Sequence, residues 1–293
     1  MSYVLTLVSA QNSLPCDEVL PYLNVLSSWD VLATDRAAEI VIKNIPSVED
    51  LRSIRALCDG VHTDVFLTPT FHRRKSLLLA DMDSTIVEGE TLDDLAAYAG
   101  LKDQISAITA RAMNGELDFH TALRERVGLL SGLSADMLRE TLGETRLNVG
   151  AERLVRTMKT HGARCVLVSG GFTFFTGAIA DQVGFDHHHG NVLDIAAGQL
   201  TGAVQEPILD KDAKLVFLKD YADQLSMNLS QAMTIGDGAN DLPMLLAAEK
   251  AGGLGMGYDA KPSVAEQLVN VIRYNDLTAA LYAQGYRADE IVD

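Results

Sequence analysis

The side chains best suited to chemistry are two aspartates, one residue apart, that follow a short apolar run. Residues 77–80 are all apolar, as in a strand buried on both faces, and Asp81 and Asp83 follow them. Two carboxylates this close repel each other unless a cation, most simply a divalent one, lies between them. Such a pair suits phosphoryl transfer, in which one carboxylate attacks phosphorus and the other handles a proton. For the pair taken alone, a capped turn is the alternative.

Two later apolar runs, residues 165–168 and 233–235, also end in polar or glycine-rich segments. The carboxyl ends of parallel strands meet at one edge of a doubly wound α/β sheet, and ligands bind just outside that edge. We therefore expect the polar residues near these strand ends to form one site with the two aspartates. The expected members are Asp81, Asp83, Ser169, Gly170, Lys214, Asp237, Asn240 and Asp241.

The composition indicates a globular chain that does not bind polyanions. Of its 293 residues, 47% are hydrophobic and 22% are charged, which is typical of a folded protein with a large core. The net charge of −16 argues against nucleic acid and anionic membranes as partners, because both require basic patches. No basic-then-apolar leader opens the chain and no apolar run approaches 18 residues, so we expect a cytoplasmic location.

The order of predicted elements divides the chain into two units. Residues 1–72 show the order βαββαβ, which is that of a ferredoxin-like α+β fold. A linker over 69–74 leads to residues 76–293, where alternating strands and helices predict an α/β fold with a doubly wound parallel sheet. Between the first two strands of this sheet, residues from about 94 to 148 predict an all-helical insert that forms a cap.

Local signals predict where individual helices begin and end. Residues 16–26 carry helical spacing behind a proline. Thr91, with an acidic residue three positions later, has the pattern of a helix cap. A further helix over 102–114 is expected to end at Gly115.

Three segments in the second half of the chain predict turns or loops. Ser169-Gly170-Gly171 indicates a turn from a strand into a helix, and Ala197-Gly198 indicates a tight hairpin. The three histidines at 187–189 invite interpretation as a metal site. Three consecutive side chains cannot all face one ion on regular backbone, so a solvated loop is the expectation.

The polar segments resemble the four motifs of the haloacid dehalogenase-like phosphotransferases over about residues 76–281. The matching segments are Asp81-x-Asp83-Ser84-Thr85, Ser169-Gly170-Gly171, Lys214 and Gly236-Asp237-Gly238-Ala239-Asn240-Asp241. The resemblance implies that Asp81 is the nucleophile and forms an aspartyl-phosphate, while Asp83 acts as general acid and then general base. It also implies a Mg²⁺ site made by Asp81, Asp237 and the backbone carbonyl of Asp83, with Asp241 farther out.

The same resemblance implies which residues bind the substrate. Ser169, the Gly170 amide, Lys214 and Asn240 would surround the phosphoryl group, although Lys211, one turn earlier, is an alternative to Lys214. Three further candidates, Glu90, Phe119 and Arg126, would contact the rest of the substrate.

The identity of the substrate depends on the predicted cap. On a helix from 119 to 130, one face is apolar except for Arg126, whose guanidinium either reaches water or meets an anion. Glu90, Phe119 and Arg126 resemble residues of the family members that hydrolyse O-phosphoserine in the last step of serine biosynthesis. By that resemblance Arg126 binds the substrate carboxylate, Glu90 receives its ammonium and Phe119 packs over the site.

The sequence is also compatible with other functions. The same core could act on another small phosphomonoester, transfer the phosphoryl group to an acceptor such as homoserine, or be a catalytically silent ligand sensor. Residues 1–72 resemble amino-acid-binding regulatory modules of the ACT type, which implies either binding of serine or support of a homodimer.

Overall fold

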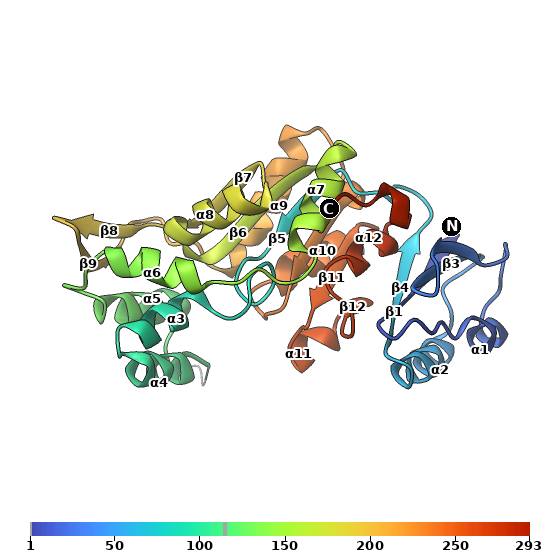
Figure 1. Ribbon diagram of the computed structural model, residues 1–293, viewed down its shortest axis with the longest axis horizontal. Helices are drawn as coiled ribbons and strands as arrows, with labels where there is room; N and C mark the ends of the chain where they lie inside the picture. Colours follow the sequence, from blue (N-terminus) through green and yellow to red (C-terminus); the bar gives the residue numbers. More distant parts are fainter. Residues whose placement is uncertain (1, 114–115) are drawn as a thin grey trace.

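The fold is described from a computed structural model, which covers residues 2–113 and 116–293 (Figure 1). A six-stranded parallel sheet lies at the centre of the molecule, in the strand order β12-β11-β10-β5-β6-β7. This is the expected α/β architecture. Its strands are β5 (Leu77–Ala80), β6 (Arg164–Phe172), β7 (His187–Asn191), β10 (Ala232–Gly236), β11 (Leu254–Tyr258) and β12 (Asn270–Ile272).

Helices cover both faces of this sheet, which explains the apolar run of β5. Leu78 and Ala80 pack into the core on one face, while Leu77 and Leu79 pack into the core on the other. The first core includes α7 (Ala151–Thr160), α8 (Thr173–Val183) and α12 (Ala279–Ala283). The second includes α9 (Lys211–Gln224), α10 (Leu242–Lys250) and α11 (Pro262–Ala265). Short 3₁₀ turns η2 (Leu229–Gln231) and η3 (Ala288–Glu290) complete this part of the chain.

The amino-terminal unit has a four-stranded antiparallel sheet in the order β2-β3-β1-β4, as expected for a ferredoxin-like fold. Its elements are β1 (Tyr3–Ser9), α1 (Cys16–Val19), η1 (Leu20–Tyr22), β2 (Asp30–Ala33), β3 (Ala37–Ile42), α2 (Val48–Asp59) and β4 (Thr63–Pro69). One face packs on its own helices through Leu5, Leu7 and Ile54. Val8 and Phe66 belong to the same apolar core as α12, so the second face packs against the larger unit.

Two predicted helices correspond to α1 and to α4 (Lys102–Met113). The helix expected over 16–26 is wrong in length, because α1 ends at Val19 and a 3₁₀ turn follows it. Pro21 has no backbone N–H and cannot continue an α-helical hydrogen-bond ladder. The helix expected over 102–114 is α4 (Lys102–Met113). Positions 114 and 115 lie outside the described residues, so its expected end at Gly115 stays a prediction.

The helices of the insert lie between β5 and β6, and a hairpin completes the cap. They are α3 (Thr91–Tyr98), α4, α5 (Phe119–Gly128) and α6 (Asp136–Glu144). Strands β8 (Leu193–Ala196) and β9 (Gln199–Val204) form the hairpin predicted around Ala197-Gly198, where both residues have positive φ. The N–H of Gly132 donates to the carbonyl of Leu200 at 2.8 Å, which joins the hairpin to the insert.

The histidine triplet belongs to a strand, so the solvated-loop prediction is wrong. His187–His189 lie in β7, at the edge of the central sheet. His188 Nδ1 contacts the Thr176 hydroxyl at 2.9 Å, and His189 Nε2 contacts the Tyr221 hydroxyl at 2.8 Å. Successive side chains of a strand point to opposite faces, which prevents the three rings from sharing one ion. Among residues 2–113 and 116–293, the structure contains no helix of the length and hydrophobicity needed to span a membrane.

Candidate active site

Asp81 lies at the carboxyl end of β5, at the edge of the central sheet, and is 4% exposed. Its N–H donates to the carbonyl of Ile235 in β10 at 3.0 Å, which fixes its backbone against the neighbouring strand. Its carboxylate Oδ1 accepts the N–H of Met82 at 2.8 Å and lies 2.6 Å from Nζ of Lys214. No hydrogen bond from the described residues reaches the other oxygen, Oδ2.

Lys214 is a buried ammonium between two carboxylates. It comes from the first turn of α9, and its Nζ lies 2.6 Å from Asp81 and 2.6 Å from Asp241. Burial would lower the pKa of Lys214, but the two carboxylates outweigh burial and raise that pKa. Lys211, the alternative considered from sequence, is exposed. The structure therefore brings Lys214, and not Lys211, beside Asp81.

Three buried carboxylates form a cluster that suits a divalent cation. One oxygen each of Asp81, Asp237 and Asp241 lies within 4.8 Å of the others. A Cβ on Gly236 would lie 2.4 Å from the Asp241 carboxylate, so only glycine permits this approach. Burial raises the pKa of Asp81 and of Asp237, and repulsion from Asp241 adds to the effect at Asp81. Oxygen donors with excess negative charge fit a hard dication.

The carboxylate of Asp83 contacts β6 and the first helix of the insert. Its Oδ2 accepts the hydroxyl proton of Ser169 at 2.9 Å, and its Oδ1 accepts the N–H of Thr91 at 2.9 Å. Thr91 is the first residue of α3 and Glu90 is its N-cap, so the predicted cap at Thr91 is wrong. Asp83 instead binds an unsatisfied amide at the start of that cap helix. Coordination of a metal through its backbone carbonyl stays a prediction.

Ser169-Gly170-Gly171 lies inside β6, so a turn at these residues is wrong, but the predicted passage from this strand into a helix is confirmed, with α8 beginning at Thr173. The register with β7 shifts between Val168 and Phe172, and this irregularity turns the segment toward Asp83. The N–H of Gly171 donates to the Ser169 hydroxyl oxygen at 2.8 Å. A Cβ on Gly171 would lie 2.9 Å from Asp83 Oδ2, which excludes a larger residue there.

Residues of the cap lie close to this segment of β6. A Cβ on Gly170 would lie 3.5 Å from Cζ of Phe119, so this ring from α5 packs over the β6 segment. Arg126 is mostly buried, and within the part of the chain that the structure describes its Nε donates only to the carbonyl of Ala122 in its own helix, at 3.3 Å. Burial lowers the pKa of Arg126, and the nearby charge of Glu90 acts in the opposite direction. No ion pair within 4.0 Å satisfies Arg126 among residues 2–113 and 116–293.

Asn240 and Lys261 lie at the rim of the acidic cluster. Asn240 is exposed in the turn after β10, and its Oδ1 would lie 2.4 Å from a Cβ on Gly238. Lys261 was not among the residues selected from sequence. Its Nζ lies 3.4 Å from Asp237 Oδ2, and its N–H donates to the Asp237 carbonyl at 3.1 Å. Its position after a strand of the same sheet, β11, is the signal that could have identified it.

Glu90 provides a test of the charge at this site. The residue is exposed, yet the atoms packed around its carboxylate and the charge of Asp83 raise its pKa to about 7. In the metal-free protein we therefore expect a carboxylate that is largely protonated below pH 7 and ionised above it, measured by ¹³C NMR. The Glu90→Gln variant removes this titration.

Addition of Mg²⁺ is expected to lower this pKa, because a dication at the cluster offsets the negative charges of Asp83 and Asp237. The matched control is the same titration with Na⁺ at equal ionic strength. A titration near pH 7 that Mg²⁺ leaves unchanged would contradict a dication beside Glu90.

Comparisons with known proteins agree with this geometry. The sequence pattern of the haloacid dehalogenase-like hydrolases matches residues 78–246. A phosphoserine phosphatase from Streptomyces coelicolor is 39% identical over 258 residues, which cover 87% of this chain but only 62% of that protein. A phosphoserine phosphatase from Saccharomyces cerevisiae is 32% identical over 306 residues, covering 99% of this chain and 98% of that protein.

A solved structure extends the similarity to the whole fold. The crystal structure of a HAD family hydrolase from Salmonella enterica serovar Typhi has a TM-score of 0.84 at 28% identity, covering 96% of this chain and 98% of the other. Members of this family generally use a divalent metal, and the cluster of Asp81, Asp237 and Asp241 provides suitable donors. The family pattern spans β5 to α10, the part of the chain that carries Asp81, Ser169, Lys214 and Asp237, and the chain therefore belongs to the haloacid dehalogenase-like hydrolases.

Proposed function

We propose that this protein hydrolyses O-phospho-L-serine to L-serine and inorganic phosphate, with Mg²⁺ as cofactor. The observation that carries the proposal is the buried ion pair of Asp81 and Lys214 beside a second carboxylate, Asp83, which is hydrogen-bonded to Ser169. This arrangement supplies a nucleophile, a cation for phosphoryl charge and a proton carrier within one site. The names of the Streptomyces and Saccharomyces relatives support phosphoserine as the substrate.

The first chemical step requires a free oxygen on Asp81. Lys214 and the amide of Met82 hold Oδ1, which leaves Oδ2 to attack phosphorus. As the new O–P bond forms, the bond from phosphorus to the serine oxygen breaks, and protonated Asp83 gives that oxygen its proton. Lys214 and the amide of Gly170 offset negative charge on the phosphoryl oxygens.

The second step returns the enzyme to its starting state. A water molecule attacks phosphorus, Asp83 takes the proton of the water, and the bond between phosphorus and Asp81 breaks to release phosphate. Mg²⁺, held by Asp81, Asp237 and the backbone carbonyl of Asp83, would supply further neutralisation of the phosphoryl charge. The cap covers the site with Phe119 and so limits access of other water molecules.

Recognition of serine is assigned to the cap and the residues after β5. The unpaired guanidinium of Arg126 binds the substrate carboxylate, and Glu90, which accepts the Ser84 hydroxyl proton at 2.9 Å, binds the ammonium. Together they match an amino acid zwitterion attached to a phosphate group. A sugar phosphate offers neither charge.

Replacement of Arg126 is expected to affect phosphoserine selectively. In Arg126→Ala, KM for phosphoserine rises about 10- to 100-fold, because a charge-assisted hydrogen bond to the carboxylate is lost. KM for p-nitrophenyl phosphate, which has no carboxylate, stays within about twofold. Steady-state kinetics with both substrates measure the difference. Arg124→Ala, on the same helix but paired with Glu206 at the surface, is the matched control.

The proposed reaction is tested by phosphate release from a substrate panel in Mg²⁺ and in EDTA. We expect phosphoserine to be turned over well above sugar phosphates, and EDTA to abolish release. Equal turnover across the panel would favour another phosphomonoester, and transfer to homoserine would identify a phosphotransferase. Absent or metal-independent release would favour a ligand sensor.

For residues 1–72 we propose a separate ACT-like domain that supports a homodimer, joined to a phosphatase domain over 76–293 with its cap at about 94–148. Exposed aliphatic residues on the amino-terminal unit, Val25, Leu26 and Val31, support an association surface. Analytical ultracentrifugation of the wild type and of Leu26→Asp tests the dimer, with the same mass for both contradicting this surface.

A further inference from the structure

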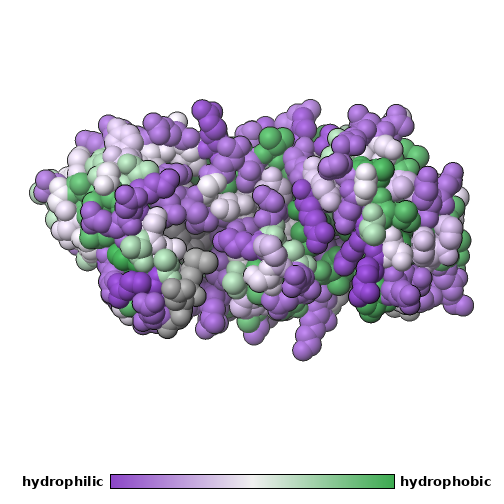
Figure 2. All heavy atoms as spheres, turned by 90° about the horizontal axis from the view of Figure 1, so that it is seen from below, coloured by the Kyte–Doolittle hydropathy of each residue, from purple (hydrophilic) through white to green (hydrophobic). Residues whose placement is uncertain are grey.

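Three arginines line a groove where the amino-terminal unit meets the central sheet. Arg52 and Arg55 lie one turn apart on α2, and Arg273 follows β12, the edge strand of the larger unit. We call this surface the arginine groove. Figure 2, which views the molecule from below, shows strongly hydrophilic side chains where the amino-terminal unit at the right meets the rest. The groove shares no lining residue with the candidate active site.

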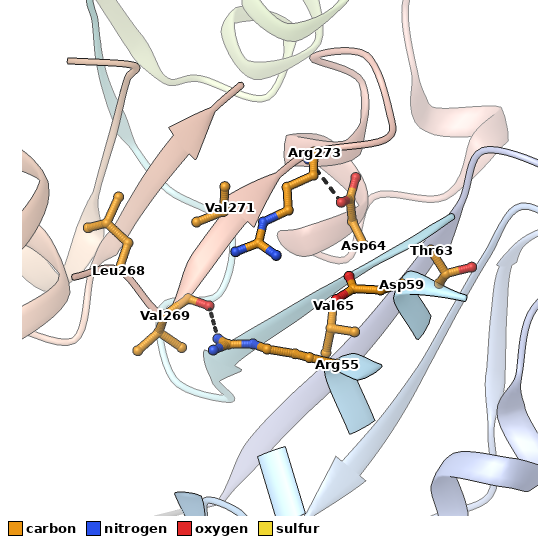
Figure 3. A pocket seen from close by; sticks show the side chains of 9 residues that line it. All are labelled: Arg55, Asp59, Thr63, Asp64, Val65, Leu268, Val269, Val271 and Arg273. Atoms are coloured by element: carbon orange, nitrogen blue, oxygen red, sulfur yellow. Dashed lines mark hydrogen bonds between the residues drawn. The ribbon is translucent and has the colours of Figure 1, made fainter. Parts of the chain in front are cut away.

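Each unit contributes a guanidinium group to the pocket, Arg55 from the amino-terminal unit and Arg273 from the larger unit. Arg55 Nη2 donates to the carbonyl of Val269 at 2.7 Å, so its side chain crosses from α2 to the larger unit. Figure 3 shows the guanidinium groups of Arg55 and Arg273 pointing into the same pocket from opposite sides. This pocket has a volume of about 30 Å³. The adjoining hollow, which Arg52 also lines, has a volume of about 370 Å³.

None of these three arginines has a carboxylate within 4.0 Å among the residues that the structure describes. Burial lowers the pKa of Arg55 and the charge of Arg273 lowers it further, while the charges of Asp59 and Glu249 act in the opposite direction. Asp64 lines the smaller pocket and is already hydrogen-bonded. Asp64 accepts the backbone N–H groups of Arg273 at 2.9 Å and of Asn275 at 3.2 Å.

The other acid at the pocket is also engaged. Asp59 accepts the hydroxyl proton of Tyr274 at 3.2 Å. An excess of positive charge held in one place attracts an anion, even in a chain whose net charge is −16. The larger hollow is lined by the three guanidinium groups and by one carboxylate, that of Asp59, so its lining keeps an excess of positive charge.

We propose that the arginine groove binds a phosphate group, carried by inorganic phosphate or by a small phosphomonoester, across the joint between the two units. A dianion with three terminal oxygens can engage several guanidinium forks at once, whereas a single carboxylate would leave most of the positive charge unmatched. The apolar side chains of Val48, Leu51 and Ala56 line the hollow beside Arg52 and give room for the organic part of an ester. The site does not depend on the reaction proposed above.

The test is calorimetric titration of the full chain with inorganic phosphate in EDTA. Without metal, the acidic active site repels phosphate, and any binding there is the same in every variant compared. Arg273→Ala is the primary variant, because the described residues make no hydrogen bond or ion pair with its exposed side chain. Arg52→Ala is the second exposed variant. Arg36→Ala, which removes an arginine paired with Asp276 across the same joint, is the matched control.

We expect wild type and Arg36→Ala to bind phosphate equally, and Arg273→Ala and Arg52→Ala to bind at least about tenfold more weakly. Equal binding by all four proteins, or no binding by the wild type, would overturn the proposal. Acetate that binds as tightly as phosphate would overturn the assignment to a phosphate group. Glycerol phosphate distinguishes the two sources: tighter binding than phosphate assigns the groove to an ester, and equal binding assigns it to free phosphate.

Discussion

Replacement of Asp81 by asparagine is expected to reduce phosphate release at least about 10⁴-fold while leaving the fold intact. Asparagine has the same shape, but its amide cannot attack phosphorus, so no covalent intermediate forms. Activity is measured with phosphoserine and with p-nitrophenyl phosphate, since loss of the nucleophile affects every substrate equally. This outcome distinguishes Asp81→Asn from Arg126→Ala, whose effect depends on the substrate.

The same variant is expected to change the free energy of unfolding by less than about 1 kcal/mol, which is the value for a substitution that leaves no buried charge unpaired. Lys214 keeps Asp241 at 2.6 Å when the charge of Asp81 is removed. Burial and repulsion from Asp241 also raise the pKa of Asp81, so removing its charge relieves an electrostatic cost of folding that offsets the lost contact with Lys214. Urea unfolding in EDTA provides the measurement.

The control for Asp81→Asn is Asp181→Asn, at an exposed position of α8, which is expected to keep full activity. A rate that Asp81→Asn leaves undiminished would exclude Asp81 as nucleophile. A large loss of stability would mean that the lost rate reflects unfolding instead of chemistry.

The centre of the site could be predicted from sequence because burial leaves a strong pattern. β5 is covered on both faces, so four apolar residues precede Asp81, and β10 precedes Asp237 in the same way. β7 gave no such signal. It is an edge strand that carries exposed histidines, and without an apolar period it could not be separated from a loop.

Contacts between distant segments were the part that sequence could not supply. The hydrogen bond from the Thr91 amide to Asp83 joins the cap to the segment after β5, and nothing in the residue types selects Asp83 over Thr91 as the cap. The sequence of β1 partly indicates how the amino-terminal sheet packs. In β1, Leu5 and Leu7 lie on one face and Val8 lies on the other. A strand with one face in water would alternate apolar and polar residues, so this pattern indicates a sheet covered on both faces.

Replacement of Lys214 by methionine is expected to destabilise the metal-free protein by about 3–5 kcal/mol, in contrast to Asp81→Asn. Methionine fills a similar volume but leaves the carboxylates of Asp81 and Asp241, both buried, without their shared cation. Catalysis is lost as well, because the cation that offsets phosphoryl charge is gone. Urea unfolding at pH 7 in EDTA measures the stability, and phosphate release in Mg²⁺ measures the activity.

The pH dependence gives this prediction a definite sign. An acid whose folded-state pKa is raised makes the folded state less stable as pH rises above its unfolded value of about 4. Burial already raises the pKa of Asp81, and loss of Lys214 removes a charge that lowers it. The difference in stability between wild type and Lys214→Met is therefore expected to shrink as pH falls from 7 toward 4. A difference that is constant over this range would mean that lost packing, and not unpaired charge, causes it.

The double variant Lys214→Met with Asp81→Asn separates these causes at a single pH. It leaves one unpaired carboxylate, Asp241, instead of two, so it is expected to be more stable than Lys214→Met alone. The two substitutions are coupled because the two side chains form one ion pair, in which Lys214 Nζ lies 2.6 Å from Asp81 Oδ1. If the changes in unfolding free energy of the two single variants simply add in the double variant, the charge of Asp81 is not what destabilises Lys214→Met. Recovery of stability without recovery of activity would show that the folded state tolerates a neutral residue at 81 although the reaction does not.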